Sequence, residues 1–106
     1  MITEIQDYYG DVSKVTTEPG NSVRIETESQ GKFWDVSFVM GGEAVYDSYN
    51  LVYTGTIVKI TNKTVTVAPK WGEKNTRMSL AKFARKNYRF DAEEIAARNA
   101  ETMMAI

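Results

Sequence analysis

The chain has no cysteine and no histidine among its 106 residues. Without cysteine it can have no disulfide, no thiolate nucleophile and no thiolate-ligated zinc or iron–sulfur site. Without histidine it lacks the commonest general base and the commonest transition-metal ligand. We therefore expect neither a cofactor nor a metal, and we predict that the protein is not an enzyme.

Glycine-rich and nucleophile motifs are missing as well. The sequence has no Walker loop, no Gly-x-Gly-x-x-Gly run and no nucleophile elbow, and the pair Gly41-Gly42 stands alone. The acidic residues lack the spacing of an EF-hand loop. These absences give no reason to expect a small-molecule substrate.

Long apolar runs are absent too. The nearest approach is residues 36–40, whereas about 20 apolar residues are needed for a helix to span a bilayer. The first residues show neither the basic region nor the apolar region of a signal peptide. We expect a soluble, cytoplasmic protein without membrane contact.

Strand patterns fill the middle of the chain. Residues 23–28 alternate apolar and polar side chains, which predicts a half-buried strand. Residues 33–40 place Trp34 and Phe38 on one face, together with two further apolar side chains, and we expect this face to lie in the core.

A hairpin is the clearest local feature of the second half. Residues 56–60 and 64–68 are rich in β-branched side chains and flank a short turn, which predicts two antiparallel strands. Shorter strands are expected at residues 44–46 and 76–78.

Helices are expected near both ends of the chain. Residues 2–9 could form a short helix, Ser79 is a candidate N-cap for residues 80–87, and Asp91 has capping-box spacing to Glu94. The chain length predicts a single domain over residues 1–106. We therefore expect an α+β fold: a twisted antiparallel sheet of about five strands, or a partly closed small barrel, with two C-terminal helices.

The net charge of −1 hides a division between the two halves of the chain. Residues 1–47 hold three basic and nine acidic side chains, a net charge of −6, whereas residues 48–106 hold ten basic and five acidic, a net charge of +5. Between Lys59 and Arg89 there are nine basic side chains and the single acid Glu73. Such asymmetry indicates a charged partner, or one half of the chain docked on the other.

A basic stripe is expected on the helix after Ser79. Four cations recur at positions i, i+3, i+4 and i+7, namely Lys82, Arg85, Lys86 and Arg89. Like charges four residues apart destabilise an isolated helix by about 0.2–0.5 kcal/mol per pair, so stability alone does not favour this arrangement. The stripe could face a phosphate-rich or acidic partner. It could equally fit against the acidic half of this chain, or be solvated.

Trp71 lies between lysines in the loop before residue 76. It could stack on a nucleic-acid base, anchor a protein contact, or fold back to cap the core. With the stripe and the neighbouring cations, the candidate partner-binding residues are Lys70, Trp71, Lys74, Arg77, Lys82, Arg85, Lys86 and Arg89.

Residues 53–68 resemble the central hairpin of SH3-like small barrels, in which a glycine before the strand, here Gly55, lets a bent sheet close. In general profile the whole chain also resembles small accessory proteins of phages and plasmids, including anti-CRISPR proteins. It shares with them a length of about a hundred residues, the lack of catalytic motifs, and an expected short sheet joined to a basic helix and a charged C-terminal helix. The resemblance implies a protein that occupies a nucleic-acid or subunit-docking surface of a host complex.

Three functions remain open at this point. The first is a non-enzymatic binding protein of a mobile element that engages and inhibits a host nucleoprotein complex through charged surfaces. The alternative is a nucleic-acid-binding small-barrel domain that uses the basic helix face and Trp71. The acidic sequence pI near 5.4 favours the first. A third reading is a structural or chaperone-like module with no charged partner.

Overall fold

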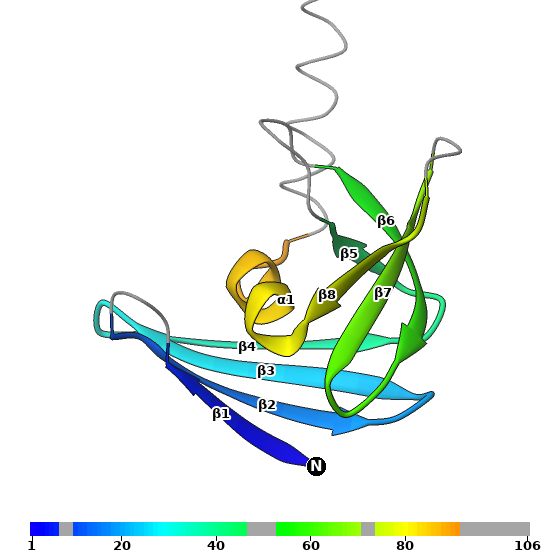
Figure 1. The fold of residues 1–106 in the computed structure, drawn as a ribbon. Helices are drawn as coiled ribbons and strands as arrows, with labels where there is room; N and C mark the ends of the chain where they lie inside the picture. Colours follow the sequence, from blue (N-terminus) through cyan, green and yellow to red (C-terminus); the bar gives the residue numbers. More distant parts are fainter. Residues whose placement is uncertain (7–9, 47–52, 71–73, 92–106) are drawn as a thin grey trace, which may run out of the picture.

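The fold of the chain, seen in a computed structural model, is mostly β (Figure 1). The structure describes residues 1–6, 10–46, 53–70 and 74–91. Sheet A has the order β1-β2-β3-β4, and its strands are Ile2–Gln6, Val12–Glu18, Ser22–Ser29 and Lys32–Val39. Sheet B has the order β5-β6-β7-β8, and its strands are Glu43–Val45, Thr54–Ile60, Thr64–Pro69 and Thr76–Ser79. Both sheets are antiparallel, and the helix α1 (Leu80–Asn87) follows β8 directly.

The expected fold is therefore wrong in its architecture. In place of one sheet of about five strands, or a partly closed barrel, the described residues form two open four-stranded sheets. In place of two C-terminal helices they form one short helix, and the second expected helix lies in residues 92–106, outside the described residues. The helix expected over residues 2–9 is also wrong, because residues 2–6 pair with β2 as a strand.

The alternation expected over residues 23–28 is confirmed in β3. Val23 and Ile25 are fully buried, whereas Arg24 between them is exposed. Gln30 and Gly31 turn the chain into β4 with φ values of 52° and 76°, the left-handed backbone that suits a two-residue hairpin turn. One face of sheet A thus points into the core and the other, called the outer face, points away from it.

The hairpin expected over residues 56–68 is confirmed as β6 and β7. A register shift between Ile57 and Lys59 marks a bulge that bends β6. Gly55 is needed because the strands approach closely: a Cβ there would lie 2.7 Å from Cγ1 of Val67 and closer still to the carbonyl oxygen of Ala68. These features curve the sheet without closing it into a barrel.

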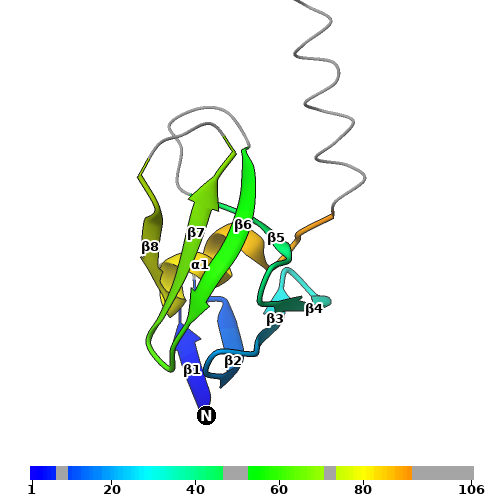
Figure 2. The same cartoon turned by 90° about the vertical axis from the view of Figure 1, so that its right-hand side faces the viewer.

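The core lies where both sheets and α1 meet. Phe83 of α1 is fully buried, and its ring packs edge-on against Phe38 of β4 with centroids 5.2 Å apart. The buried apolar side chains form one cluster, which comprises Val15, Val23, Ile25, Phe38, Ala44, Tyr46, Ile57, Ile60, Val65, Val67, Met78, Leu80, Phe83 and Ala84. In Figures 1 and 2, α1 lies against the inner face of sheet A beside the upright sheet B.

Both ends of α1 are fixed by side-chain hydrogen bonds. Ser79 Oγ accepts a bond from the backbone N–H of Lys82 at 3.2 Å, which confirms the expected N-cap. Near the other end, buried Asn87 accepts from Val45 N at 2.7 Å and donates to Val45 O at 3.0 Å and Phe83 O at 3.1 Å. Asn87 therefore ties α1 to the edge of sheet B.

Backbone hydrogen bonds also join β6 to the turn after β2 and to the segment after β4. Gly20 N donates to Ile60 O, and Gly41 N donates to Ile57 O, both at 2.9 Å. Within the described part of the chain, no helix is long and apolar enough to cross a membrane.

Candidate interaction surface

The eight candidate residues fall on three parts of the molecule. Lys70 follows β7, Lys74 precedes β8 and Arg77 lies within β8, and all three are exposed. Three of the four cations of the basic stripe lie in α1, and the fourth lies after the end of the helix. Trp71, the candidate anchor, lies outside the described residues.

The helical part of the stripe forms as the sequence predicts. Phe83 and Ala84 are buried against the sheets, so the cations of α1 are carried on its other side. Arg85 is exposed, and Lys82 and Lys86 are half-buried. All three belong to one continuous helix that the Ser79 cap starts at Leu80.

Arg89 does not continue the stripe. The helix ends at Asn87, so the spacing of four residues no longer places Arg89 on the same face. Its guanidinium carbon instead lies 5.3 Å from the ring centroid of Trp34 and 5.1 Å from that of Tyr88. These are cation–π distances, and they attach Arg89 to its own chain.

Sheet B adds two cations, Lys59 and Lys63, that are not among the eight candidate residues. Lys59 in β6 is paired in register with Thr66 in β7, and Thr66 with Arg77 in β8. Because neighbouring strands are about 4.8 Å apart, Lys59 and Arg77 lie roughly 10 Å from each other on the outer face of sheet B. Lys63, in the turn between β6 and β7, is exposed as well. The hairpin register was the signal that could have revealed this row.

These residues define what we call the basic surface. Because α1 begins where β8 ends, the cations of sheet B and those of α1 adjoin along β8. The basic surface comprises Lys59, Lys63, Lys70, Lys74, Arg77, Lys82, Arg85 and Lys86. It also borders one carboxylate, since Lys70 Nζ lies 3.4 Å from Oε1 of Glu43.

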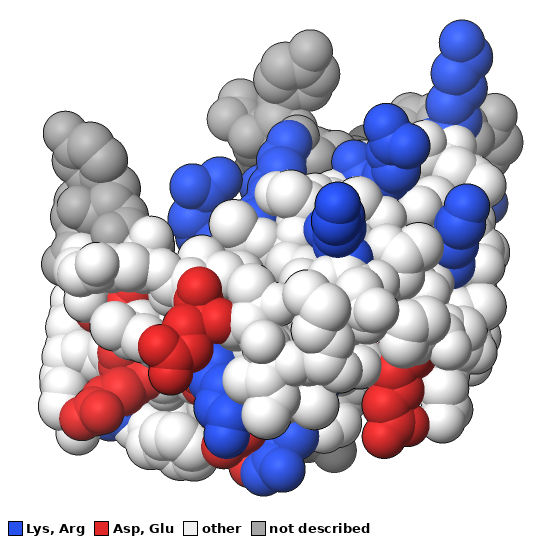
Figure 3. Space-filling view, turned by 60° about the horizontal axis from the view of Figure 1, so that its bottom comes forward, with Lys and Arg blue, Asp and Glu red and all other residues white. Residues whose placement is uncertain are grey.

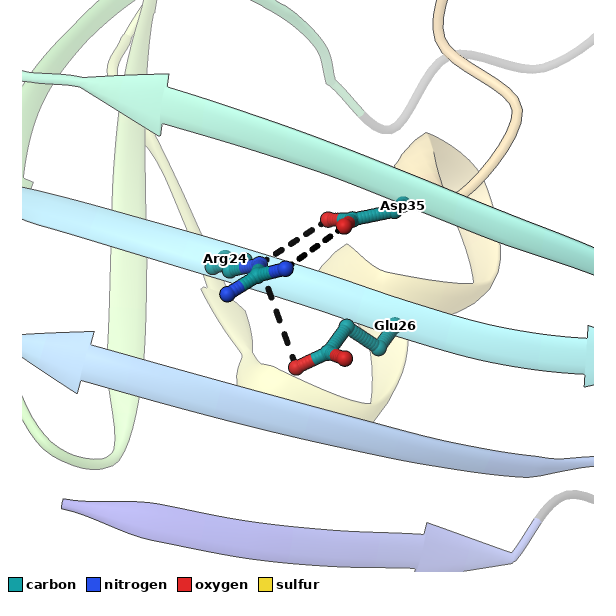
Figure 4. A network of polar contacts seen from close by, with 3 residues as sticks. All are labelled: Arg24, Glu26 and Asp35. Atoms are coloured by element: carbon teal, nitrogen blue, oxygen red, sulfur yellow. Dashed lines mark hydrogen bonds and ion pairs between the residues drawn. The ribbon is translucent and has the colours of Figure 1, made fainter.

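The outer face of sheet A carries acidic side chains. Figure 4 shows Arg24 held there between Asp35 and Glu26. Its guanidinium donates to both carboxylate oxygens of Asp35 at 2.9 and 2.6 Å and lies 3.9 Å from Glu26. These hydrogen bonds lower the pKa of Asp35 below its ordinary value and raise that of Arg24. Glu28 is exposed on the same strand face.

Sheet A itself separates these two groups of charges. α1 packs on the inner face of sheet A, where Phe83 contacts Phe38. Glu26, Glu28 and Asp35 extend from the outer face, on the other side of the sheet. In Figure 3, Lys and Arg side chains gather mostly over the upper part of the molecule, and Asp and Glu over the lower part. The acidic outer face of sheet A therefore cannot neutralise the cations of α1.

The described residues offer no obvious place for a metal ion. Within residues 1–6, 10–46, 53–70 and 74–91, no group of three or more Asp or Glu side chains is arranged to hold one. Comparison with protein-family models, with curated proteins and with solved structures finds no match to this chain.

Proposed function

We propose that this chain is a non-enzymatic binding protein of a mobile element that engages a host nucleoprotein complex, and inhibits it, through its basic surface. The observation that carries the proposal is the separation of charge by sheet A. Because Glu26, Glu28 and Asp35 lie on the far side of the sheet from α1, they do not cover its exposed cation Arg85.

The chemistry of the basic surface suits an extended anionic partner. Its cations come from β6, β8, α1 and the segments beside them, so they are spread over several elements and do not converge on one point. A distributed positive surface attracts a row of phosphates or an acidic protein face, and it speeds association at low salt. A nucleoprotein complex presents both kinds of surface.

Charge reversal tests the proposal. Arg77→Glu with Arg85→Glu changes two exposed cations of the basic surface, and Lys14→Glu with Lys32→Glu makes the same change in net charge on sheet A. In a pull-down from bacterial lysate, we expect the first double variant to lose the partner complex and the second to keep it. Equal recovery by both variants would show that the basic surface is not the docking surface.

Direct nucleic-acid binding is the second candidate. The row formed by Lys59, Thr66 and Arg77 favours it, because two cations flank a hydroxyl on an open strand face where a phosphate backbone could lie. If duplex DNA binds there, the logarithm of the affinity falls with the logarithm of salt concentration with a slope of about −0.9 for each phosphate contact.

Fluorescence anisotropy with single- and double-stranded oligonucleotides measures that slope. We expect Arg77→Glu with Arg85→Glu to make the slope for duplex DNA shallower by about 2, because two phosphate contacts are lost. The Lys14→Glu and Lys32→Glu double variant keeps the wild-type slope. No binding at low salt and micromolar protein would reject this candidate and leave the protein-docking proposal standing.

A further inference from the structure

Among the described residues, two open sheets leave four edge strands, whose outward backbone groups can bind another strand. The edge of β5 is covered, since Asn87 occupies both the N–H and the C=O of Val45. β8 offers only a short edge for pairing, because it has four residues and continues directly into α1. The edges of β1 and β4 therefore remain as candidates for pairing.

β4 presents the longest of these edges, with eight residues and no proline. Met40 N donates to Asn21 O at 2.9 Å, which fixes the alternation of the β3–β4 ladder. Because alternate residues of an antiparallel strand face opposite neighbours, the backbone groups that point to the open edge belong to Phe33, Asp35, Ser37 and Val39. Among the described residues no strand lies beyond β4, which forms the margin of sheet A in Figure 2.

We propose that β4 binds β4 of a second copy of this chain in antiparallel pairing, which joins two A sheets into one continuous sheet. The register that fits places Val36 opposite Val36 of the other copy. Phe33 then lies opposite Val39, two side chains that are 64% and 56% exposed in the single chain. Asp35 lies opposite Ser37, whose hydroxyl can donate to the carboxylate.

The charge pattern disfavours two competing pairings. A shift of the pairing centre by one residue, to Asp35, places the two Asp35 carboxylates opposite each other, and like charges in that position destabilise a sheet. Pairing of two β1 strands about their centre places Glu4 opposite Glu4. In the β4 register centred on Val36, no like charges are opposed.

Nearly all outward backbone groups of β4 gain a partner in this register. Asp35 and Ser37 exchange two hydrogen bonds and Phe33 O accepts one from Val39 N, and the two-fold symmetry repeats each of these. The carbonyl of Val39 already accepts from Gly42 N at 2.9 Å, so it needs no further donor. The two-fold axis stands perpendicular to the sheet, which puts both copies of α1 and sheet B on the same side.

Sedimentation equilibrium over a range of concentrations tests the proposal. We expect the wild-type chain to reach twice its 12.0 kDa mass as concentration rises. Ser37→Pro removes one outward N–H from each copy without touching the β3 ladder, and should weaken the dimer by at least about tenfold. Glu4→Pro removes an outward N–H from the other edge of sheet A and is the matched control, which should leave dimerisation unchanged.

A monomer at millimolar concentration would overturn the proposal, and would leave the β4 edge to an extended segment of another protein. Equal weakening by the two proline variants would also overturn it. Thermal unfolding of each variant shows whether the monomer remains folded, so that loss of the dimer is not confused with loss of the fold.

Single-cysteine cross-linking tests the register, because the chain has no cysteine of its own. In the proposed dimer the two Val36 Cα atoms form a non-hydrogen-bonded pair about 4.5 Å apart, which a disulfide can bridge. Val36→Cys should therefore give a covalent dimer under mild oxidation. Phe33→Cys should not, since the two copies of residue 33 lie six positions apart along the strands, roughly 20 Å. The reverse result would contradict the register.

Discussion

Asn87 is the residue through which α1, β5 and the core are connected. It is fully buried, and its amide satisfies both backbone groups of Val45 and the carbonyl of Phe83. A buried amide with three hydrogen bonds is favourable because no polar group is left unpaired. The same arrangement makes any shorter side chain at this position costly.

We expect Asn87→Ala to lower the free energy of unfolding by about 2–4 kcal/mol, since the N–H and C=O of Val45 lose their partners away from water. Urea denaturation measures the change. Asn75→Ala, at an exposed position before β8, is the matched control and should lie within about 0.5 kcal/mol of the wild type. A value for Asn87→Ala inside that same range would refute the structural role.

Asp35 links stability to pH through its bonds with Arg24. Its folded pKa lies below the ordinary value of 3.8, so its contribution to stability is present above that value and is lost as pH falls through the folded pKa. Asp35→Asn should therefore flatten the fall in stability on acidification. The effect is small because the pair is exposed. Urea midpoints of both proteins at a series of acidic pH values measure it, and parallel curves would contradict the expectation.

At the scale of elements, α1 has only eight residues and depends on its cap and its packing. Helices this short are not stable alone, so each end contact matters. Ser79→Ala should cost about 1 kcal/mol, because the N–H of Lys82 loses its acceptor, whereas Ser79→Asp keeps an acceptor there and should cost much less. Chemical denaturation compares them, and equal losses for both variants would rule out the capping explanation.

Some strands could be predicted from the sequence pattern, and others could not. β3, β4, β6 and β7 show period-two alternation or β-branched runs, and the structure confirms all four. β2 was missed because its inward positions are Ser13, Val15 and Thr17, and the two polar side chains hide the alternation. Thr17 is nevertheless only 1% exposed.

The arrangement of the strands was less predictable than their positions. A single sheet was expected, yet at Gly41-Gly42 the chain passes from sheet A to sheet B. That change depends on contacts between residues far apart, such as Gly41 with Ile57, which no local pattern encodes. The basic surface was anticipated on α1 and at Arg77 of sheet B but not at Lys59, since Lys59 joins Arg77 only through strand register.

At the scale of the whole molecule, the two sheets share one core and should unfold together. Val23 and Ile25 of sheet A and Val65 and Val67 of sheet B are all fully buried in the same cluster. Native-state hydrogen exchange should therefore give the amides of Ile25 and Val65 the same free energy of opening. Exchange of one sheet at a much lower free energy than the other would show that the sheets open as separate units.

The simple strand order has a consequence for folding kinetics. In both sheets every strand pairs only with strands that adjoin it in the chain, and the helix follows the last strand without a gap. Pairings of this kind close short loops, so little chain entropy is lost before native contacts form. The relative contact order is accordingly low for a β protein. Stopped-flow refolding should be faster than that of a Greek-key sandwich of the same length, and the search for partners within each sheet should not limit the rate.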